Sequence, residues 1–183
     1  ADGRIGKVSD AQGIVVLRPL PARRWTPICR ETLLKPGDWL RTELRGANAV
    51  KVTLTSEVEI TLGPGSLLEC ISPTSARLHS GEAQVALAEA EKEPAAPFTL
   101  LAPRDGEERF TEGKRLVRVT QEERLVSLPQ QPLWLQGFEG TTNNESLGSL
   151  IVTLPDGRNE PLTVGYHKVD VVIRDQIART TIE

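Results

Sequence analysis

With 183 residues, the chain has room for one compact domain and part of a second. Hydrophobic residues make up 38% of the sequence and charged residues 26%, which is typical of a globular protein rather than of an intrinsically disordered or membrane-embedded chain. The 22 basic and 25 acidic side chains are mixed along the whole length and give a formal net charge of −3, so no basic stripe is available for nucleic acid.

Neither a membrane-spanning segment nor a targeting segment is visible in the sequence. No apolar run approaches the ~18 to 20 residues needed to cross a bilayer. Residues 1–4 lack the apolar core of a signal peptide. We therefore predict no membrane insertion within this chain and expect any targeting segment to lie outside this sequence.

Apolar residues alternate with other residues in the first half of the chain, as in residues 13–17, 50–54 and 57–62. Gly-, Pro- and Ser-containing turns separate these short segments. The pattern predicts an all-β fold of short antiparallel strands, arranged as a sandwich, a barrel or a twisted solenoid. The predicted core comprises Ile5, Val15, Leu17, Leu40, Val52, Leu54, Ile60, Leu68 and Val85.

The composition of residues 82–93 is that of a helix, but its first half also alternates and directly follows a Ser-Gly turn. We therefore predict a strand as far as Leu87, followed by a polar connector to Pro97. Glu89, Glu91 and Glu93 in that connector are interpreted as solvated rather than as calcium ligands.

Strand patterns resume at residues 98–101, 115–119, 124–128 and 132–135. A run of Gly, Thr, Asn and Ser follows, with the composition of an exposed linker. We therefore divide the chain into an all-β domain at residues 1–136, a linker at 137–146 and a second, partial β unit at 147–183.

In residues 32–42, a leucine is followed by Gly37-Asp38, an apolar residue and Thr42. This is the most specific of the matches by which residues 3 to about 101 resemble the FecR-like domain. The opening strand at residues 3–8 and the turn at residues 78–85 are also similar. The match departs after Pro103, because the Gly-Thr pair usual in the family is missing. The resemblance implies an extracytoplasmic β domain, known best from a periplasmic transducer that signals to a sigma factor and also needs a membrane helix.

A second pattern consists of residues 150–152, 156–158, 161–162, 167–175 and 177–183. By these pieces, residues 147–183 resemble the beginning of a VIT domain, the module named after vault protein and inter-alpha-trypsin inhibitor heavy chains. Intact VIT domains are several times longer, which implies that the parent protein continues past Glu183. The apolar strands at residues 168–174 and 177–182 would then lack their partners, so they should either pack on the FecR-like unit or pair with another chain. We expect pairing between chains, which would give a homo-oligomer.

The sequence contains no recognisable catalytic, cofactor-binding or metal-binding motif. His79 and His167 are the two histidines, and each is far in sequence from a second ligand at zinc-like spacing. Cys29 and Cys70 can form either one disulfide or two buried thiols, and the sequence leaves both alternatives open. The chain is therefore predicted not to be an enzyme and to need no cofactor or metal.

Two groups of residues are candidates for special roles. In the FecR-like segment, Gly37 supplies a permissive φ, Asp38 is expected to bond to backbone amides two residues on, and Thr42 supplies a strand-end hydroxyl. We interpret these three residues as a structural motif. Trp25, Trp39 and Trp134 are candidates for a contact surface, with burial in the core as the alternative for each.

Taken together, these features favour a non-catalytic interaction or scaffolding module of a bacterial cell-envelope or surface protein, with sensing as one version of that role. The expected partner is another protein. A periplasmic FecR-type transducer and a carbohydrate-binding module are the two alternatives.

Overall fold

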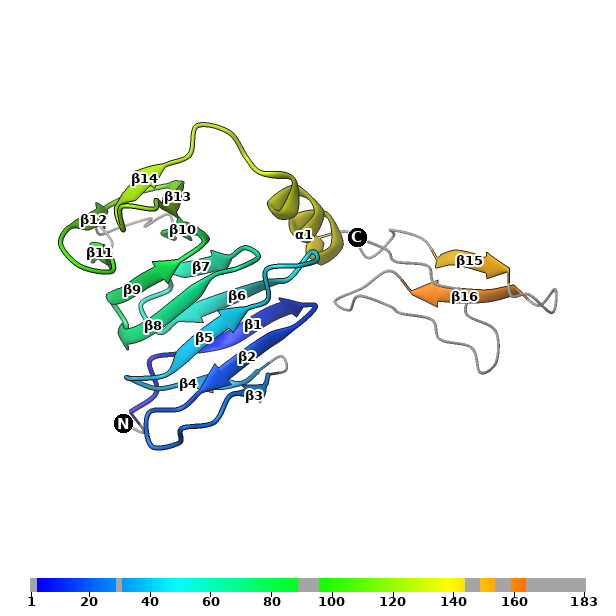
Figure 1. The fold of residues 1–183 in the computed structure, drawn as a ribbon, viewed down its shortest axis with the longest axis horizontal. Helices are drawn as coiled ribbons and strands as arrows, with labels where there is room; N and C mark the ends of the chain where they lie inside the picture. The colour runs from blue at the N-terminus through cyan, green and yellow to red at the C-terminus, as the bar shows by residue number, and fades with distance from the viewer. Residues whose placement is uncertain (1–2, 29–30, 89–95, 144–148, 154–158, 164–183) are drawn as a thin grey trace.

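The computed structural model describes residues 3–28, 31–88, 96–143, 149–153 and 159–163. Most of this part of the chain forms two seven-stranded β-sheets (Figure 1). The first sheet has the spatial order β14 (Leu125–Ser127), β13 (Lys114–Val119), β10 (Glu82–Ala86), β7 (Glu59–Leu62), β6 (Ala49–Leu54), β1 (Gly6–Gln12) and β4 (Leu33–Leu34). The second has the order β12 (Glu107–Phe110), β11 (Phe98–Leu101), β9 (Ser75–Ser80), β8 (Leu67–Ser72), β5 (Trp39–Thr42), β2 (Val15–Arg18) and β3 (Thr26–Pro27). The all-β prediction is confirmed, and the architecture is a sandwich.

The chain moves back and forth between the two sheets as it advances from β3 and β4 at one end to β12 and β14 at the other (Figure 1). Neighbouring strands are antiparallel, except that β11 runs parallel to β9. Many neighbours in a sheet are therefore distant in sequence, as where Val8 of β1 pairs with Val52 of β6. This topology brings residues from separate segments onto one sheet face.

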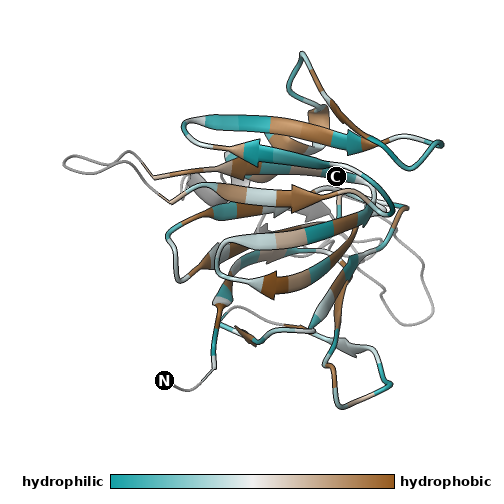
Figure 2. Cartoon of the chain, turned by 90° about the vertical axis from the view of Figure 1, so that its left-hand side faces the viewer, coloured by the Kyte–Doolittle hydropathy of each residue, from teal (hydrophilic) through white to brown (hydrophobic). Residues whose placement is uncertain are grey.

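One hydrophobic core fills the space between the sheets. All nine residues predicted for the core are buried, and they belong to a single cluster that both sheets contribute to. Hydrophobic and hydrophilic residues alternate along the strands (Figure 2), because successive side chains of a strand point to opposite faces. Alternating burial along β5 and β6 follows this rule.

The strand predicted within the helix-like segment is confirmed, because β10 pairs with β7 on one side and β13 on the other. Its central position in the sheet overrides the helix propensity of its residues. The connector glutamates Glu89, Glu91 and Glu93 lie outside the described residues.

The predicted strand at residues 132–135 is wrong, and part of the predicted linker is helical. Helix α1 (Leu133–Asn143) begins directly after Pro132, a residue that favours the first turn of a helix. Leu135 and Phe138, three positions apart, are both buried. Because a short apolar run fits strand and helix equally well, the sequence pattern gave no means of separating them.

Strands β15 (Ser149–Thr153) and β16 (Asn159–Thr163) form an antiparallel pair. They include residues 150–152 and 161–162 of the VIT-like segment. The predicted strands at residues 168–174 and 177–182 lie outside the described part of the chain, and their pairing between chains stays a prediction.

Candidate functional site

A row of polar and aromatic side chains crosses the outer face of the second sheet. Arg18 of β2 is paired in register with Trp39 of β5, Trp39 with Glu69 of β8, and Glu69 with Arg77 of β9. All four are partly exposed and alternate with buried neighbours on their strands. The sheet thus places on one surface residues that are up to 59 positions apart in the chain.

The side chains along this row contact one another. Trp39 stacks on the ring of His79 with 4.4 Å between the ring centroids and 17° between the ring planes. Nε2 of His79 lies 3.0 Å from Oε1 of Glu69, and the same oxygen lies 3.8 Å from Nη1 of Arg77. The guanidinium carbon of Arg18 lies 4.9 Å from the centre of the Trp39 ring.

Trp25 extends the row at the β3 side of the sheet. It directly precedes β3, which pairs with β2. The guanidinium carbons of Arg18 and Arg41 lie 5.2 Å and 4.5 Å from the centre of its ring. Cation–π contacts of this kind are worth about 0.5 to 2 kcal/mol each, depending on solvation. We call this surface the aromatic–arginine cluster, and it comprises Arg18, Trp25, Trp39, Arg41, Glu69, Arg77 and His79.

Two of the three predicted contact tryptophans, Trp25 and Trp39, therefore lie on one surface, and Trp134 lies elsewhere. Trp134 belongs to α1, and its Nε1 donates a 2.7 Å hydrogen bond to Oε2 of Glu82. Its indole packs so closely on Gly63 that a Cβ added there would lie 2.4 Å from Cε2 of the ring. Trp134 thus fastens the helix to the sandwich.

The structural motif at Gly37, Asp38 and Thr42 holds strands together. Gly37 has a φ of 90°, and its amide donates to the carbonyl of Cys70 at 2.8 Å. Oδ2 of the buried Asp38 accepts a 2.8 Å bond from the amide of Lys35, three residues earlier, so the expected bond to an amide two residues on is wrong. The Asp38 bond closes the turn that starts β5.

Thr42 occupies a buried position at the other end of β5. Its hydroxyl donates to the carbonyl of Gly63 at 2.6 Å and accepts from the amide of Ser66 at 2.9 Å. The hydroxyl is thus engaged in both directions, and it ties β5 to the loop between β7 and β8.

Cys70 is a buried free thiol within the second sheet. Burial, with smaller contributions from the nearby carboxylates of Asp38 and Glu69, raises its thiol pKa to about 12. A thiol protonated at neutral pH is a poor nucleophile. The sequence left open a disulfide or two free thiols, and in the structure the thiol of Cys70 is free. Cys29 lies outside the described residues.

A shallow hollow of about 410 Å³ adjoins the aromatic–arginine cluster where β5 and β9 end and β8 begins. It is lined by Arg41, Thr42, Glu43, Leu44, Gly65, Ser66, Leu67 and Ser80. Arg41 belongs to both features. The hollow was not foreseen from the sequence, because the segments that line it are separated along the chain.

Within the described residues, no three His, Cys, Asp or Glu side chains gather as a metal site would require. His167 falls in the part of the chain that the structure leaves undescribed. A further search of the described residues finds no helix with the length and apolar character needed to span a bilayer.

Arg18, Arg41, Glu69, Arg77 and His79 were missed at the sequence level. Alternation alone assigns each of them to the outer face of its own strand. What brings them to the two tryptophans is the pairing of β2, β5, β8 and β9, which a single-strand pattern does not contain.

No protein-family model and no curated protein matches this chain. A solved structure described as "Cell surface anchoring domain" is similar over 37% of this chain and 86% of its own length, with 16% sequence identity and a TM-score of 0.34. A TM-score of this size carries no argument about function. The described residues form an all-β sandwich whose second sheet carries the partly exposed aromatic–arginine cluster on its outer face.

Proposed function

We propose that this chain is a non-catalytic protein–protein interaction module of an extracytoplasmic bacterial protein, and that the aromatic–arginine cluster is its contact surface. The observation that carries the proposal is the gathering of Trp25, Trp39 and three arginines on the outside of a sheet, where they stay partly exposed. Tryptophan and arginine dominate binding energy at protein interfaces. The extracytoplasmic, bacterial setting rests on the FecR-like and VIT-like sequence patterns.

The contacts within the cluster favour binding because they order its side chains before a partner arrives. Trp39 is fixed by His79, and Trp25 by two guanidinium groups. Immobilising a flexible side chain on binding costs about 0.5 to 1.5 kcal/mol. Side chains that are already stacked on each other incur less of this cost.

A protein partner suits the cluster better than a carbohydrate. A sugar ring stacks on a free aromatic face, whereas Trp39 already has an imidazole stacked on it and Trp25 has guanidinium groups over its ring. The cluster therefore offers charged groups and ring edges, which match the polar and acidic surface of a protein.

The proposal is tested with two charge-matched variants. R18A/R41A removes two arginines from the cluster, and K7A/K51A removes two cations from the outer face of the first sheet, on β1 and β6. Immobilised wild-type protein and both variants would be incubated with envelope extract. Each protein retained by the wild type would then be purified and its affinity measured by calorimetry.

We expect a purified partner to bind the wild type and K7A/K51A equally, and R18A/R41A at least about tenfold more weakly. Far-UV circular dichroism would verify that both variants are folded. Equal loss of affinity in the two variants would instead show a general electrostatic effect and contradict the assignment of the surface.

A further inference from the structure

Arg41 is the cationic residue among those that line the hollow beside the cluster. Arg41 is paired in register with Leu67 of β8, so its side chain lies on the same outer face as the cluster. The ring of Trp25 lies 4.5 Å from its guanidinium carbon and supports it from one side. Arg41 also lines the hollow of about 410 Å³.

Arg41 makes a loose ion pair with Glu43. Oε1 of Glu43 lies 3.8 Å from Nη2 of Arg41, which is within ion-pair range but beyond hydrogen-bond distance. Its Nε is buried without a hydrogen-bond acceptor in the described part of the chain. Because the Arg41 side chain is 42% exposed while its Nε is buried, a ligand carboxylate would bind its terminal Nη1 and Nη2 in the two-pronged geometry that guanidinium groups favour.

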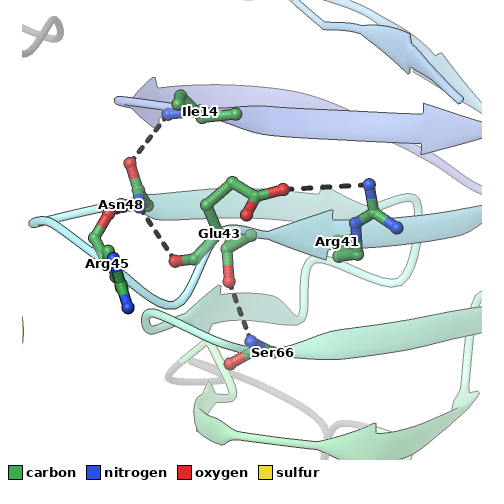
Figure 3. Close-up of polar contacts among 7 residues, drawn as sticks. Ile14, Arg41, Glu43, Arg45, Asn48 and Ser66 are labelled. Atoms are coloured by element: carbon green, nitrogen blue, oxygen red, sulfur yellow. Dashed lines mark hydrogen bonds and ion pairs between the residues drawn. The ribbon is translucent and has the colours of Figure 1, made fainter.

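The loop that forms one wall of the hollow is fixed by its own hydrogen bonds. The side-chain amide of Asn48 donates to the carbonyls of Glu43 and Arg45 at 2.8 Å each, and its oxygen accepts from the amide of Ile14 at 2.8 Å (Figure 3). Asn48 is itself 1% exposed. Asn48 thus anchors from the inside the loop that lines the hollow.

Apolar surface surrounds the charged group. Leu44, on the anchored loop, is 74% exposed, and the partly exposed Leu67 also lines the hollow. Ile14, whose carbonyl accepts from the amide of Glu43, is 55% exposed at the same end of the sandwich. A ligand that fills this site therefore carries one anionic group flanked by apolar groups.

We propose that the hollow binds a glutamate or aspartate side chain of a protein partner, in a segment where apolar residues flank the acidic one. This inference rests on the proposed function and names the chemistry of the partner. The cationic excess of the adjoining surface favours an acidic segment, because the cluster has three arginines against one glutamate, and the exposed Arg23 and Arg24 directly precede Trp25 in the chain. An anionic polysaccharide fits less well, since it brings hydroxyl groups rather than apolar groups to Leu44 and Leu67.

Glu43 supplies a sharp test because its carboxylate competes with the ligand for Arg41. Among the described residues, its side chain contacts a charged group only at Arg41, at 3.8 Å, whereas its backbone makes the bonds that hold the loop. E43Q should therefore leave the fold intact and strengthen binding, while R41Q should weaken it. A merely structural role for the Arg41–Glu43 pair would not produce opposite effects on affinity.

The probe is a blocked heptapeptide, acetyl-Ser-Gly-Leu-Glu-Leu-Gly-Ser-amide, titrated into the full chain at pH 7 and low ionic strength by NMR. The control peptide has Gln in place of Glu, and polygalacturonate serves as the anionic polysaccharide. We expect the Glu peptide to shift the Nε–H signal of Arg41 and to bind about tenfold more tightly than the Gln peptide. R41Q should abolish this preference, E43Q should increase affinity several-fold, and K51Q, on the outer face of the first sheet, should leave it unchanged.

The proposal is overturned if the wild-type chain binds the two peptides equally or binds neither of them. It is also overturned if polygalacturonate binds with the same dependence on Arg41 and Glu43, because the ligand would then be a polysaccharide. A partner purified from envelope extract that still depends on Arg18 and Trp25 but not on Arg41 would leave the proposed function standing while removing this site.

Discussion

Substitution of Val52 tests the packing of the sandwich core at a single side chain. It is fully buried at the centre of β6, with Ile60 of β7 and Val8 of β1 as its register partners. Val52→Asp should destabilise the protein by about 3 to 5 kcal/mol, because an unpaired charge would be buried among apolar side chains. Thermal unfolding followed by circular dichroism would measure the loss.

The matched control for that substitution is Thr55→Asp, which places the same carboxylate at an exposed position just after β6. Its melting temperature should stay close to that of the wild type. A Val52→Asp variant that melts with the wild type would show that this strand does not face the core.

The thiol of Cys70 should make stability depend on pH in the alkaline range. Its pKa is about 12 in the folded chain against an ordinary value of 9.0, so the folded state holds the proton more tightly. The sign follows from linkage: the thiol's contribution is fully present below about pH 9 and is lost as the pH rises from 9 towards 12. Each pH unit in this window costs about 1.4 kcal/mol.

This contribution is isolated by comparing the wild type with Cys70→Val. Free energies of unfolding in urea at pH 8 and pH 10 should fall by about 1.4 kcal/mol more in the wild type than in the variant. Other groups that titrate in this range act on both proteins and cancel in the comparison. The same pH dependence in both would refute the raised pKa.

At the scale of single elements, helix α1 packs on the sandwich through the contact between Trp134 and Gly63, and the energy of this contact can be measured. A Cβ at Gly63 would lie 2.4 Å from the Trp134 ring, so Gly63→Ala must displace the indole. We expect Gly63→Ala to cost about 1 to 3 kcal/mol, as overpacking of a close contact does. In the background of Trp134→Ala, the same substitution should cost much less.

The losses of stability caused by Gly63→Ala in the two backgrounds, together with the loss caused by Trp134→Ala, form a double-mutant cycle. Urea denaturation of the four proteins would give the coupling energy. Independent, additive effects would mean that Gly63 is needed for its backbone rather than for space under the helix.

The sequence predicted well those strands in which buried and outward residues alternate within the strand itself. Strand β6 alternates cleanly between buried and outward residues, so Val52 and Leu54 were assigned to the core from the sequence. Helix α1 was missed because Leu133, Trp134 and Leu135 form a run too short to have a period. Gly137 and Gly140 are also poor helix formers, so packing of Leu135 and Phe138 must stabilise the helix.

The candidate site was predictable only in part, and the reason is also physical. Trp25 and Trp39 were singled out because exposed tryptophans mark contact surfaces. Their arginine and histidine neighbours were not, because strand register decides which outward residues meet. Trp39 meets His79 and Arg18 only through the pairing of strands that are distant in sequence.

At the scale of the whole molecule, the two sheets share one core and should not unfold separately. The buried cluster runs from Ile5 near the start of β1 to Val117 in β13, and each sheet contributes to it. Removing one sheet would expose the inner face of the other, which is why sandwiches of this kind unfold as a unit. The strands from β1 to β13 should therefore unfold in one cooperative transition with a single free energy of unfolding.

The three tryptophans allow this cooperativity to be tested, because Trp25 and Trp39 lie on the outer face of the second sheet while Trp134 fastens α1 to Gly63. In urea, tryptophan fluorescence and far-UV circular dichroism should give the same midpoint and a single transition. Val52→Asp, in the first sheet, should shift both signals together to lower urea, because the core that it disrupts also supports Trp39. A fluorescence transition that precedes the circular dichroism transition would show that α1 or the aromatic–arginine cluster detaches while the sheets remain folded, and the single-unit description would then be wrong.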